Sequence, residues 1–214
     1  MKTRILIVDD HPVVRRGLAA TLGADPDFIV AGEAADGDDA IMKARELRPD
    51  LVLLDIALPG KNGLEVLKTL RAEMPRLAVL VLSTFPERQY ALRCLRSGAR
   101  GYLTKSSASE ELLDAVRKVR EGGKYISAPL ADLLAAELTR DPDRLPHERL
   151  SDREFQVLCM LGRGQSVPEV AAALSLSVST VHTHRAHLLE KMNLETTAQL
   201  VRYVVDHNLS ESPE

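Results

Sequence analysis

The chain has 214 residues, with 45% hydrophobic and 28% charged residues and a formal net charge of −3, a balance typical of a soluble globular protein with one large or two modest domains. Aromatic residues make up only 3% of the chain and Trp is absent, so any core must be aliphatic. No apolar run approaches the roughly 18–20 residues of a membrane span, and acidic residues interrupt the first apolar run too early for a secretion signal, so we expect a cytoplasmic protein with no membrane partner.

Apolar runs and helical repeats alternate through the first 123 residues. Strands are predicted by the short aliphatic runs at 4–8, 28–31, 51–55, 77–82 and 101–103. Helices are predicted where apolar residues recur at helical spacing, at 13–22, 40–47, 64–70, 91–95 and 112–119. Five strands that alternate with five helices predict a doubly wound α/β domain with a parallel sheet.

The pattern changes after Gly123. A short helix is predicted at 129–138, and the polar, proline-containing stretch that follows is typical of a linker. From Leu150 onward there are helical patterns but no strand signals, with helices expected at 151–161, 166–174, 178–192 and 196–207. Two short helices, a tight turn and a longer helix indicate a helix-turn-helix.

The two cysteines, Cys94 and Cys159, lie far apart in the sequence and in apolar surroundings. There is no CxxC pair and no Cys/His group at metal-ligand spacing. We therefore expect two buried, reduced thiols rather than a disulfide or a metal site.

Asp55 interrupts the apolar run Leu51–Leu58, which Pro49-Asp50 and Pro59-Gly60 bound. A run of this kind predicts a strand buried on both faces of a parallel sheet. Because ligands bind at the carboxyl ends of such strands, Asp55 should lie at the working edge of the sheet. Taken alone, Asp55 could equally cap a helix or join a buried ion pair.

Other polar residues also follow predicted strands. Asp9 and Asp10 end the first strand, which neighbours the third in a doubly wound sheet, so they should converge with Asp55. Three like charges repel one another unless a cation lies among them, and carboxylate oxygens without Cys or His suit Mg²⁺. Ser83 ends the fourth strand and Lys105 follows the fifth, which would add a hydroxyl and an ammonium to the same cleft.

Metal, hydroxyl and ammonium together make a constellation that binds a phosphoryl group, and a carboxylate can itself attack phosphorus. Each residue also has a plain structural interpretation, since Asp9 and Asp10 could favour the next helix by their charge and Lys105 could be solvated. Their joint placement at the ends of separate strands favours the phosphoryl site.

The stretch 178–192 has two dissimilar faces. Val181, Leu188 and Met192 share one side at 100° per residue, whereas the opposite arc is small and polar, which suits a major groove but is also common on solvated helices. That arc consists of Ser179, His182, Thr183, Ala186, His187 and Glu190. Residues 151–214 carry five basic and eight acidic side chains, so we expect modest affinity per module and binding as a dimer.

The segments ILIVDDHPVVRRGL, LVLLDIALPGKNGLEVL, VLVLSTF and GARGYLTKS resemble a response-regulator receiver domain over roughly residues 1–123. This resemblance implies a flavodoxin-like fold with Asp55 as phosphoacceptor. It implies Mg²⁺ ligation by Asp10, Asp55 and the Ala57 carbonyl, with Asp9 acting through water.

The same resemblance implies that Ser83 is the switch hydroxyl, that Lys105 pairs with the phosphate and that Tyr102 is the aromatic residue that changes rotamer. Thr84 is a competing switch hydroxyl, but it lies one residue past the strand end, so alternation aims it elsewhere.

The segment LSDREFQVLCMLGRGQSVPEVAAALSLSVSTVHTHRAHLLEKMNL resembles the LuxR-type helix-turn-helix, over about residues 147–209, and the whole chain resembles the NarL/FixJ class of response regulators. This resemblance implies that 178–192 is the recognition helix, with His182, Thr183 and Ala186 near base edges. It implies phosphate or supporting contacts by Ser179, Thr180, Arg185, His187 and Lys191.

We therefore expect a receiver at 1–123, a linker at 124–146, a helix-turn-helix domain at 147–209 and a tail at 210–214. The expected function is transcriptional regulation, in which a sensor histidine kinase phosphorylates Asp55 and thereby promotes dimerisation or release of the domain that binds promoter DNA. An aspartyl-phosphate phosphatase is a rival, but it would need a second carboxylate near Asp55, and the residue two positions on is Ala57. A protein–protein adaptor is a third reading, which the acidic C-terminal part leaves open.

Overall fold

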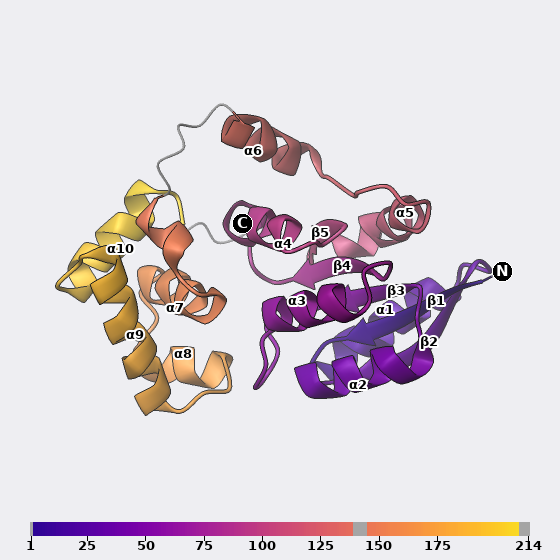
Figure 1. The fold of residues 1–214 in the computed structure, drawn as a ribbon, viewed down its shortest axis with the longest axis horizontal. Helices are drawn as coiled ribbons and strands as arrows, with labels where there is room; N and C mark the ends of the chain where they lie inside the picture. Colours follow the sequence, from indigo (N-terminus) through magenta and orange to yellow (C-terminus); the bar gives the residue numbers. More distant parts are fainter. Residues whose placement is uncertain (1, 139–144, 210–214) are drawn as a thin grey trace. The chain divides into compact units, whose positions relative to one another are not determined.

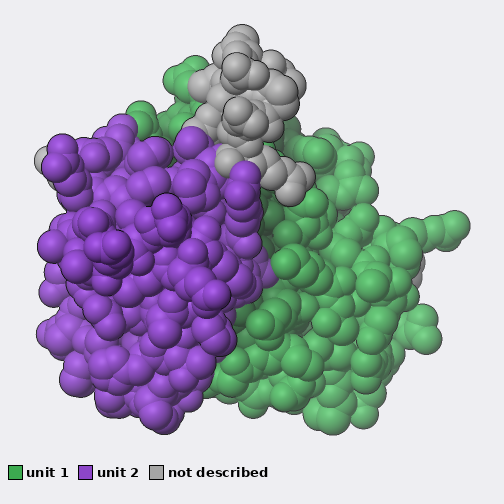
Figure 2. All heavy atoms as spheres, turned by 60° about the vertical axis from the view of Figure 1, so that its left-hand side comes forward, with its two compact units in different colours: residues 1–137 green, residues 138–214 purple. Residues whose placement is uncertain are grey.

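The computed structural model describes residues 2–138 and 145–209, and the chain divides into two compact units, residues 1–137 and 138–214 (Figure 2). The tail expected at 210–214 and residues 139–144 of the expected linker lie outside the described residues. Each unit is described by itself below.

The described part of the first unit contains a five-stranded parallel sheet in the order β2-β1-β3-β4-β5 (Figure 1). The strands are β1 (Thr3–Val8), β2 (Phe28–Ala34), β3 (Leu51–Leu54), β4 (Ala78–Ser83) and β5 (Gly101–Thr104). Each predicted strand is present, and their parallel order confirms the doubly wound α/β class. Parallel pairing buries both faces of the central strands, which explains their unbroken aliphatic sequences.

Helices cover both faces of this sheet. They are α1 (Pro12–Gly23), α2 (Gly37–Leu47), α3 (Gly63–Glu73), α4 (Glu87–Arg96) and α5 (Ala108–Arg120), and α6 (Ala128–Leu138) follows them along the chain. Right-handed crossovers place α1 on one face, because the chain steps outward from β1 to β2, and place α2, α3 and α4 on the other face as the chain steps back across the sheet. Helix α5 joins α1, and the two helices contact each other.

The core beneath α1 and α5 is mainly aliphatic, as the composition predicts, with Phe28 as an aromatic member of the buried cluster. Ile7 and Leu53 of the sheet, Leu22 of α1 and Val116 of α5 belong to this cluster, and each is at most 1% exposed. Burial of one such side chain stabilises the fold by about 1.5–3 kcal/mol. The free energy gained in this layer fixes the strands, whose carboxyl ends carry the polar residues of interest.

Strand β2 is longer than its aliphatic run predicts. The run ends at Ala31, but pairing with β1 continues to Ala34, with a register shift where Ile5 and Leu6 lie opposite Val30 and Gly32. The shift leaves Ala31 as an extra residue, as in a β-bulge. Backbone pairing at the sheet edge, rather than hydrophobicity, therefore sets the length of this strand.

The described residues of the second unit form helices and no strand. The elements are the 3₁₀ turn η1 (Pro146–Arg149), α7 (Asp152–Gly162), α8 (Val167–Ala173), α9 (Val178–Met192) and α10 (Thr197–Asp206). The predicted capping box is present, since Ser151 accepts from the Glu154 N–H and Glu154 accepts from the Ser151 N–H. Gly162 of α7 lies against Val204 of α10, because a Cβ there would meet that side chain.

Both cysteines are free thiols with buried side chains, as predicted. Within the two described ranges, no helix is both long enough and apolar enough to cross a lipid bilayer.

Candidate functional site

Three carboxylates meet at the carboxyl edge of the sheet. Asp9 and Asp10 follow β1 and Asp55 follows β3, and these strands are neighbours. The Asp55 N–H donates to the Val8 carbonyl at 2.9 Å, which fixes Asp55 beside the end of β1. Ligand atoms of Asp9, Asp10, His11 and Asp55 all lie within 4.8 Å of one another. The structure confirms the convergence of the three aspartates and adds His11, which no sequence pattern singled out.

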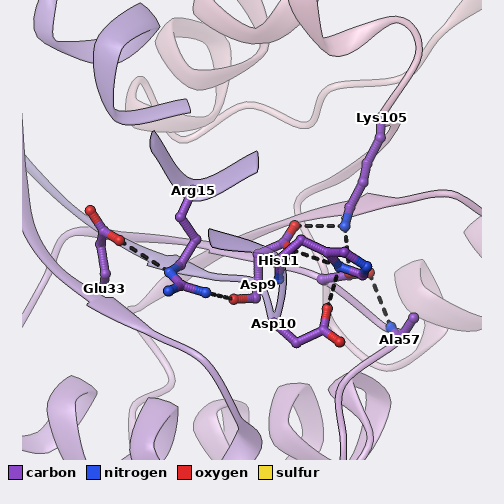
Figure 3. A network of polar contacts seen from close by, with 8 residues as sticks. Asp9, Asp10, His11, Arg15, Glu33, Ala57 and Lys105 are labelled. Atoms are coloured by element: carbon purple, nitrogen blue, oxygen red, sulfur yellow. Dashed lines mark hydrogen bonds and ion pairs between the residues drawn. The ribbon is translucent and has the colours of Figure 1, made fainter. Parts of the chain in front are cut away.

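Lys105 lies between two of these carboxylates (Figure 3). Its Nζ is 2.6 Å from Asp55 Oδ2 and 2.6 Å from Asp9 Oδ2. The Lys105 side chain is 13% exposed and those of Asp9 and Asp55 are 1% exposed. Lys105 is therefore held within the site and is not a solvated surface lysine.

Backbone and arginine contacts orient the carboxylates. The Ala57 N–H donates to Asp55 Oδ1 at 3.0 Å, and the His11 N–H donates to Asp9 Oδ1 at 2.9 Å. Arg15 donates to the Asp9 carbonyl at 2.6 Å and to Glu33 at 3.1 Å, and so braces the end of β1 against β2 (Figure 3). Each buried carboxylate thus keeps a fixed direction.

Burial and charge act in opposite directions in this site. Burial raises the pKa of Asp55, and the nearby Lys105 ammonium only partly offsets this effect. Burial works to lower the pKa of Lys105, but Asp55 and Asp9 outweigh it, so the pKa of Lys105 is raised. The ammonium is therefore charged at neutral pH, while the Asp55 carboxylate lies in surroundings that favour additional positive charge.

The donor set fits a hard divalent cation. Asp9 Oδ2 and Asp10 Oδ1 are buried, and each meets a single nitrogen at 2.6 Å, Lys105 Nζ and His11 Nδ1 respectively, without a well-aligned hydrogen bond. Buried carboxylate oxygens with incomplete hydrogen bonding are costly unless a cation compensates them. Oxygens from several carboxylates with no thiolate suit Mg²⁺.

Ser83 and Tyr102 lie beside this edge and are fully buried. Ser83 Oγ accepts the Phe85 N–H at 3.1 Å, and the Tyr102 hydroxyl donates to the Phe85 carbonyl at 2.7 Å. Tyr102 thus points inward, and its burial raises the pKa of its hydroxyl well above the usual value. Thr84 is exposed, as strand alternation predicts.

A glycine holds α3 against the phosphoacceptor candidate. The Gly63 N–H donates to the Ile56 carbonyl at 3.1 Å. A Cβ at Gly63 would fall on the Asp55 carbonyl oxygen and lie 2.6 Å from Ile56 Cα. Asn62 caps the helix at this point by accepting the Glu65 N–H at 2.9 Å. The close approach of two backbones therefore requires glycine, and no hydrophobic pattern announces it.

The two faces predicted for residues 178–192 are those of α9. Val181 and Leu188 are fully buried and Met192 is 5% exposed. The opposite arc is exposed and consists of Ser179, His182, Thr183, Ala186, His187 and Glu190. Two short helices, a turn and a longer helix with one exposed polar face form a helix-turn-helix arrangement within the second unit.

Both cations of α9 contact other helices of the second unit. Arg185 Nε donates to Thr197 Oγ1 at 3.0 Å, and Lys191 Nζ lies 2.8 Å from both carboxylate oxygens of Glu154. The resemblance implies phosphate or supporting contacts for Arg185 and Lys191, and it did not predict these contacts within the unit, because helical periodicity gives the face of a residue but not its reach. His184 is half-buried, and burial lowers the pKa of its imidazole.

Two family models match the chain. The response regulator receiver domain matches residues 5–117, and the luxR family of bacterial regulatory proteins matches residues 148–204. This protein is a response regulator. The chain is 34% identical over 209 residues to the response regulator protein VraR of Staphylococcus epidermidis, covering 98% of this chain and 99% of VraR. It is 34% identical over 207 residues to the transcriptional regulatory protein LiaR of Bacillus subtilis, covering 96% and 98% respectively.

A solved structure of RcsB from Salmonella enterica serovar Typhimurium, bound to the promoter rprA in the presence of phosphomimetic BeF3⁻, has the same fold. It aligns with a TM-score of 0.65 and 23% identity over 96% of this chain and 99% of that one.

The response regulator thus combines a flavodoxin-like receiver with a LuxR-type DNA-binding domain, an organisation consistent with the NarL/FixJ class. Receiver domains bind Mg²⁺ in an acidic pocket, and the cluster of Asp9, Asp10 and Asp55 has that character. The family receives its signal from sensor kinases and acts on promoter DNA.

Proposed function

We propose that Asp55 accepts the phosphoryl group that switches this response regulator. The burial of Asp55 against both Asp9 and the Lys105 ammonium carries the proposal. Asp10, Asp55 and the Ala57 carbonyl would hold Mg²⁺, with Asp9 acting through water. The ion would neutralise charge between the carboxylate and the incoming phosphoryl group.

An oxygen of Asp55 forms the new bond to phosphorus while the bond to the donor's leaving atom breaks, and the electron pair departs with the donor. Lys105 already lies beside Asp55 and pairs with the added phosphate charge. Ser83 turns its hydroxyl to the phosphate, and Tyr102 responds from its inward position. The Asp55 carboxylate is consumed and restored only by loss of its own phosphoryl group, so the protein is a switch and not an enzyme with an external substrate.

The exposed arc of α9 supports binding to the major groove of double-stranded promoter DNA. His182, Thr183 and Ala186 would reach base edges. Phosphate or supporting contacts would come from Ser179, Thr180, Arg185, His187 and Lys191. The internal contacts of Arg185 and Lys191 favour the supporting role for these two side chains.

The proposed boundaries are 1–123 for the receiver, 124–146 for the linker, 147–209 for the DNA-binding domain and 210–214 for the tail. The protein acts in the cytoplasm, where a cognate sensor histidine kinase supplies it with the phosphoryl group. Phosphorylation then promotes a homodimer, release of the DNA-binding domain, or both, so that two half-sites are bound together.

Labelling with radioactive acetyl phosphate tests the phosphoacceptor. The full chain should take up label only with Mg²⁺, and Asp55→Ala should take up none. The matched control is Asp38→Ala, which removes a carboxylate that is 79% exposed and paired with Lys61. Undiminished labelling of Asp55→Ala would remove Asp55 from the role, and turnover of a phosphomonoester would favour the phosphatase.

Binding of the full chain to promoter and scrambled duplexes tests the second domain. With beryllofluoride present, affinity for the promoter should fall steeply as salt rises. His187→Ala should weaken binding, whereas Arg202→Ala, which truncates an exposed side chain of α10, should not. Binding indifferent to salt and sequence would favour the adaptor.

A further inference from the structure

The chain returns to the sheet after α5. Gly101 at the start of β5 forms a parallel bridge with Tyr125, whose N–H donates to the Arg100 carbonyl at 2.8 Å. A Cβ at Gly101 would lie 2.8 Å from both the Cβ and the carbonyl oxygen of Tyr125. Only glycine admits this approach, so the edge of β5 is shaped to receive the segment. Residues 124–130 are called the latch segment below.

Side chains hold the latch segment at two further points. The Tyr125 hydroxyl donates to Glu111 of α5 at 2.6 Å, and the Ser127 hydroxyl donates to Glu87 of α4 at 2.6 Å. Ser127 Oγ also accepts the Leu130 N–H at 3.2 Å, and the Leu130 side chain is fully buried. The segment thus contacts α4, β5 and α5 within the first unit and sets where α6 begins.

Glu87, which holds Ser127, is the first residue of α4 and lies two positions after Phe85. Phe85 is tied to the switch residues, because its N–H donates to Ser83 Oγ and its carbonyl accepts the Tyr102 hydroxyl. Its ring also stacks on Tyr90 of α4, with centroids 4.6 Å apart. A short, packed connection therefore joins Ser83 to the latch segment.

We propose that the latch segment covers the α4–β5–α5 face and holds the start of α6 to the receiver until Asp55 is phosphorylated. This inference rests on the proposed roles of Asp55 and Ser83. When Ser83 turns toward a phosphoryl group on Asp55, Phe85 loses the acceptor of its N–H, and the loop into α4 moves. Glu87 moves with it, the bond to Ser127 breaks, and the segment leaves the face.

Hydrogen exchange of the full chain, with and without beryllofluoride and Mg²⁺, tests the latch segment at the amides of Tyr125, Leu130 and Ala131. These amides should exchange at least tenfold faster with beryllofluoride, since a hydrogen bond to a carboxylate contributes about that factor or more. Asp55→Ala should show no change. Ser127→Ala should speed exchange without beryllofluoride, whereas Thr69→Ala, which removes a hydroxyl bonded within α3, should not.

Two further measurements distinguish a latch segment that responds to phosphorylation from one that is simply packed against the receiver. Glu87→Ala should behave as Ser127→Ala does, while Glu87→Gln, which keeps an oxygen acceptor, should restore most of the protection. By thermodynamic reciprocity, Ser127→Ala should bind beryllofluoride more tightly than the wild type, by up to the factor with which beryllofluoride loosens the segment. If beryllofluoride binds at Asp55 but exchange at the three amides stays unchanged or slows, the latch is refuted while the proposed function stands. If beryllofluoride does not bind, the proposed function itself fails.

Discussion

The contact of Gly63 with the backbone beneath Asp55 makes a sharp prediction for Gly63→Ala. The new methyl group would meet the Asp55 carbonyl oxygen and would lie 2.6 Å from Ile56 Cα, so α3 or the end of β3 must move by about an ångström. Overpacking of a core costs about 1–3 kcal/mol. Here the obstacle is backbone and not a flexible side chain, so we expect the upper end, about 3 kcal/mol.

Native-state hydrogen exchange at the amides of β1 and β3 measures this cost in the full chain, since it follows the receiver separately from the second unit. A loss of about 3 kcal/mol speeds global exchange by roughly 100-fold. Labelling by acetyl phosphate should fall as well, because the displaced backbone carries Asp55.

Gly17→Ala is the matched control, because Gly17 is exposed in α1 and a Cβ there meets nothing within 4 Å. It should slow exchange, since replacing a helical glycine by alanine stabilises by about 0.5–1 kcal/mol. The packing argument would be refuted if the exchange rates of Gly63→Ala stayed within threefold of those of the wild type. An equal loss of stability in Gly63→Ala and Gly17→Ala would refute it as well.

Three further predictions concern buried groups. Tyr102→Phe leaves the Phe85 carbonyl without its donor and should destabilise the receiver by about 1–2 kcal/mol. A urea titration in which hydrogen exchange monitors the receiver measures this loss. Leu188→Ala empties a fully buried position of α9 and should destabilise the second unit by about 2–5 kcal/mol, whereas the exposed Ala186→Ser should change its melting little. The pKa of His184 is lowered from 6.5 in the folded unit, so the unfolded chain binds more protons just below that value, and the second unit should lose stability as pH falls through 6.5. His184→Gln should weaken this loss in thermal melts compared at pH 7.5 and 5.5, and an unaltered pH dependence would contradict the assignment.

Features governed by local pattern could be read from the sequence. Residues 178–192 form the predicted helix with the predicted buried face, because periodicity at 3.6 residues reports which side meets a core. The convergence of Asp9, Asp10 and Asp55 also followed, since polar residues at the ends of adjacent parallel strands share one edge.

Side-chain contacts between elements that are far apart in the sequence could not be predicted from the sequence. The brace from Arg15 to Glu33 joins α1 to β2, and the bond from Ser127 to Glu87 spans 40 residues. A sequence pattern gives the direction of such a side chain but not its partner. The requirement for glycine at Gly63 and Gly101 is likewise invisible, because it comes from a neighbouring backbone and not from the local chain.

The separation of a buried and an exposed face on α9 has an evolutionary consequence. Val181, Leu188 and Met192 secure the helix, while Ser179, His182, Thr183, Ala186 and His187 lie exposed on its other side. Substitutions among the exposed residues carry little penalty in folding free energy. With the proposed role of this face in reading DNA, operator preference can therefore drift by single mutations without intermediates that fail to fold, and the receiver and its signal need not change with it.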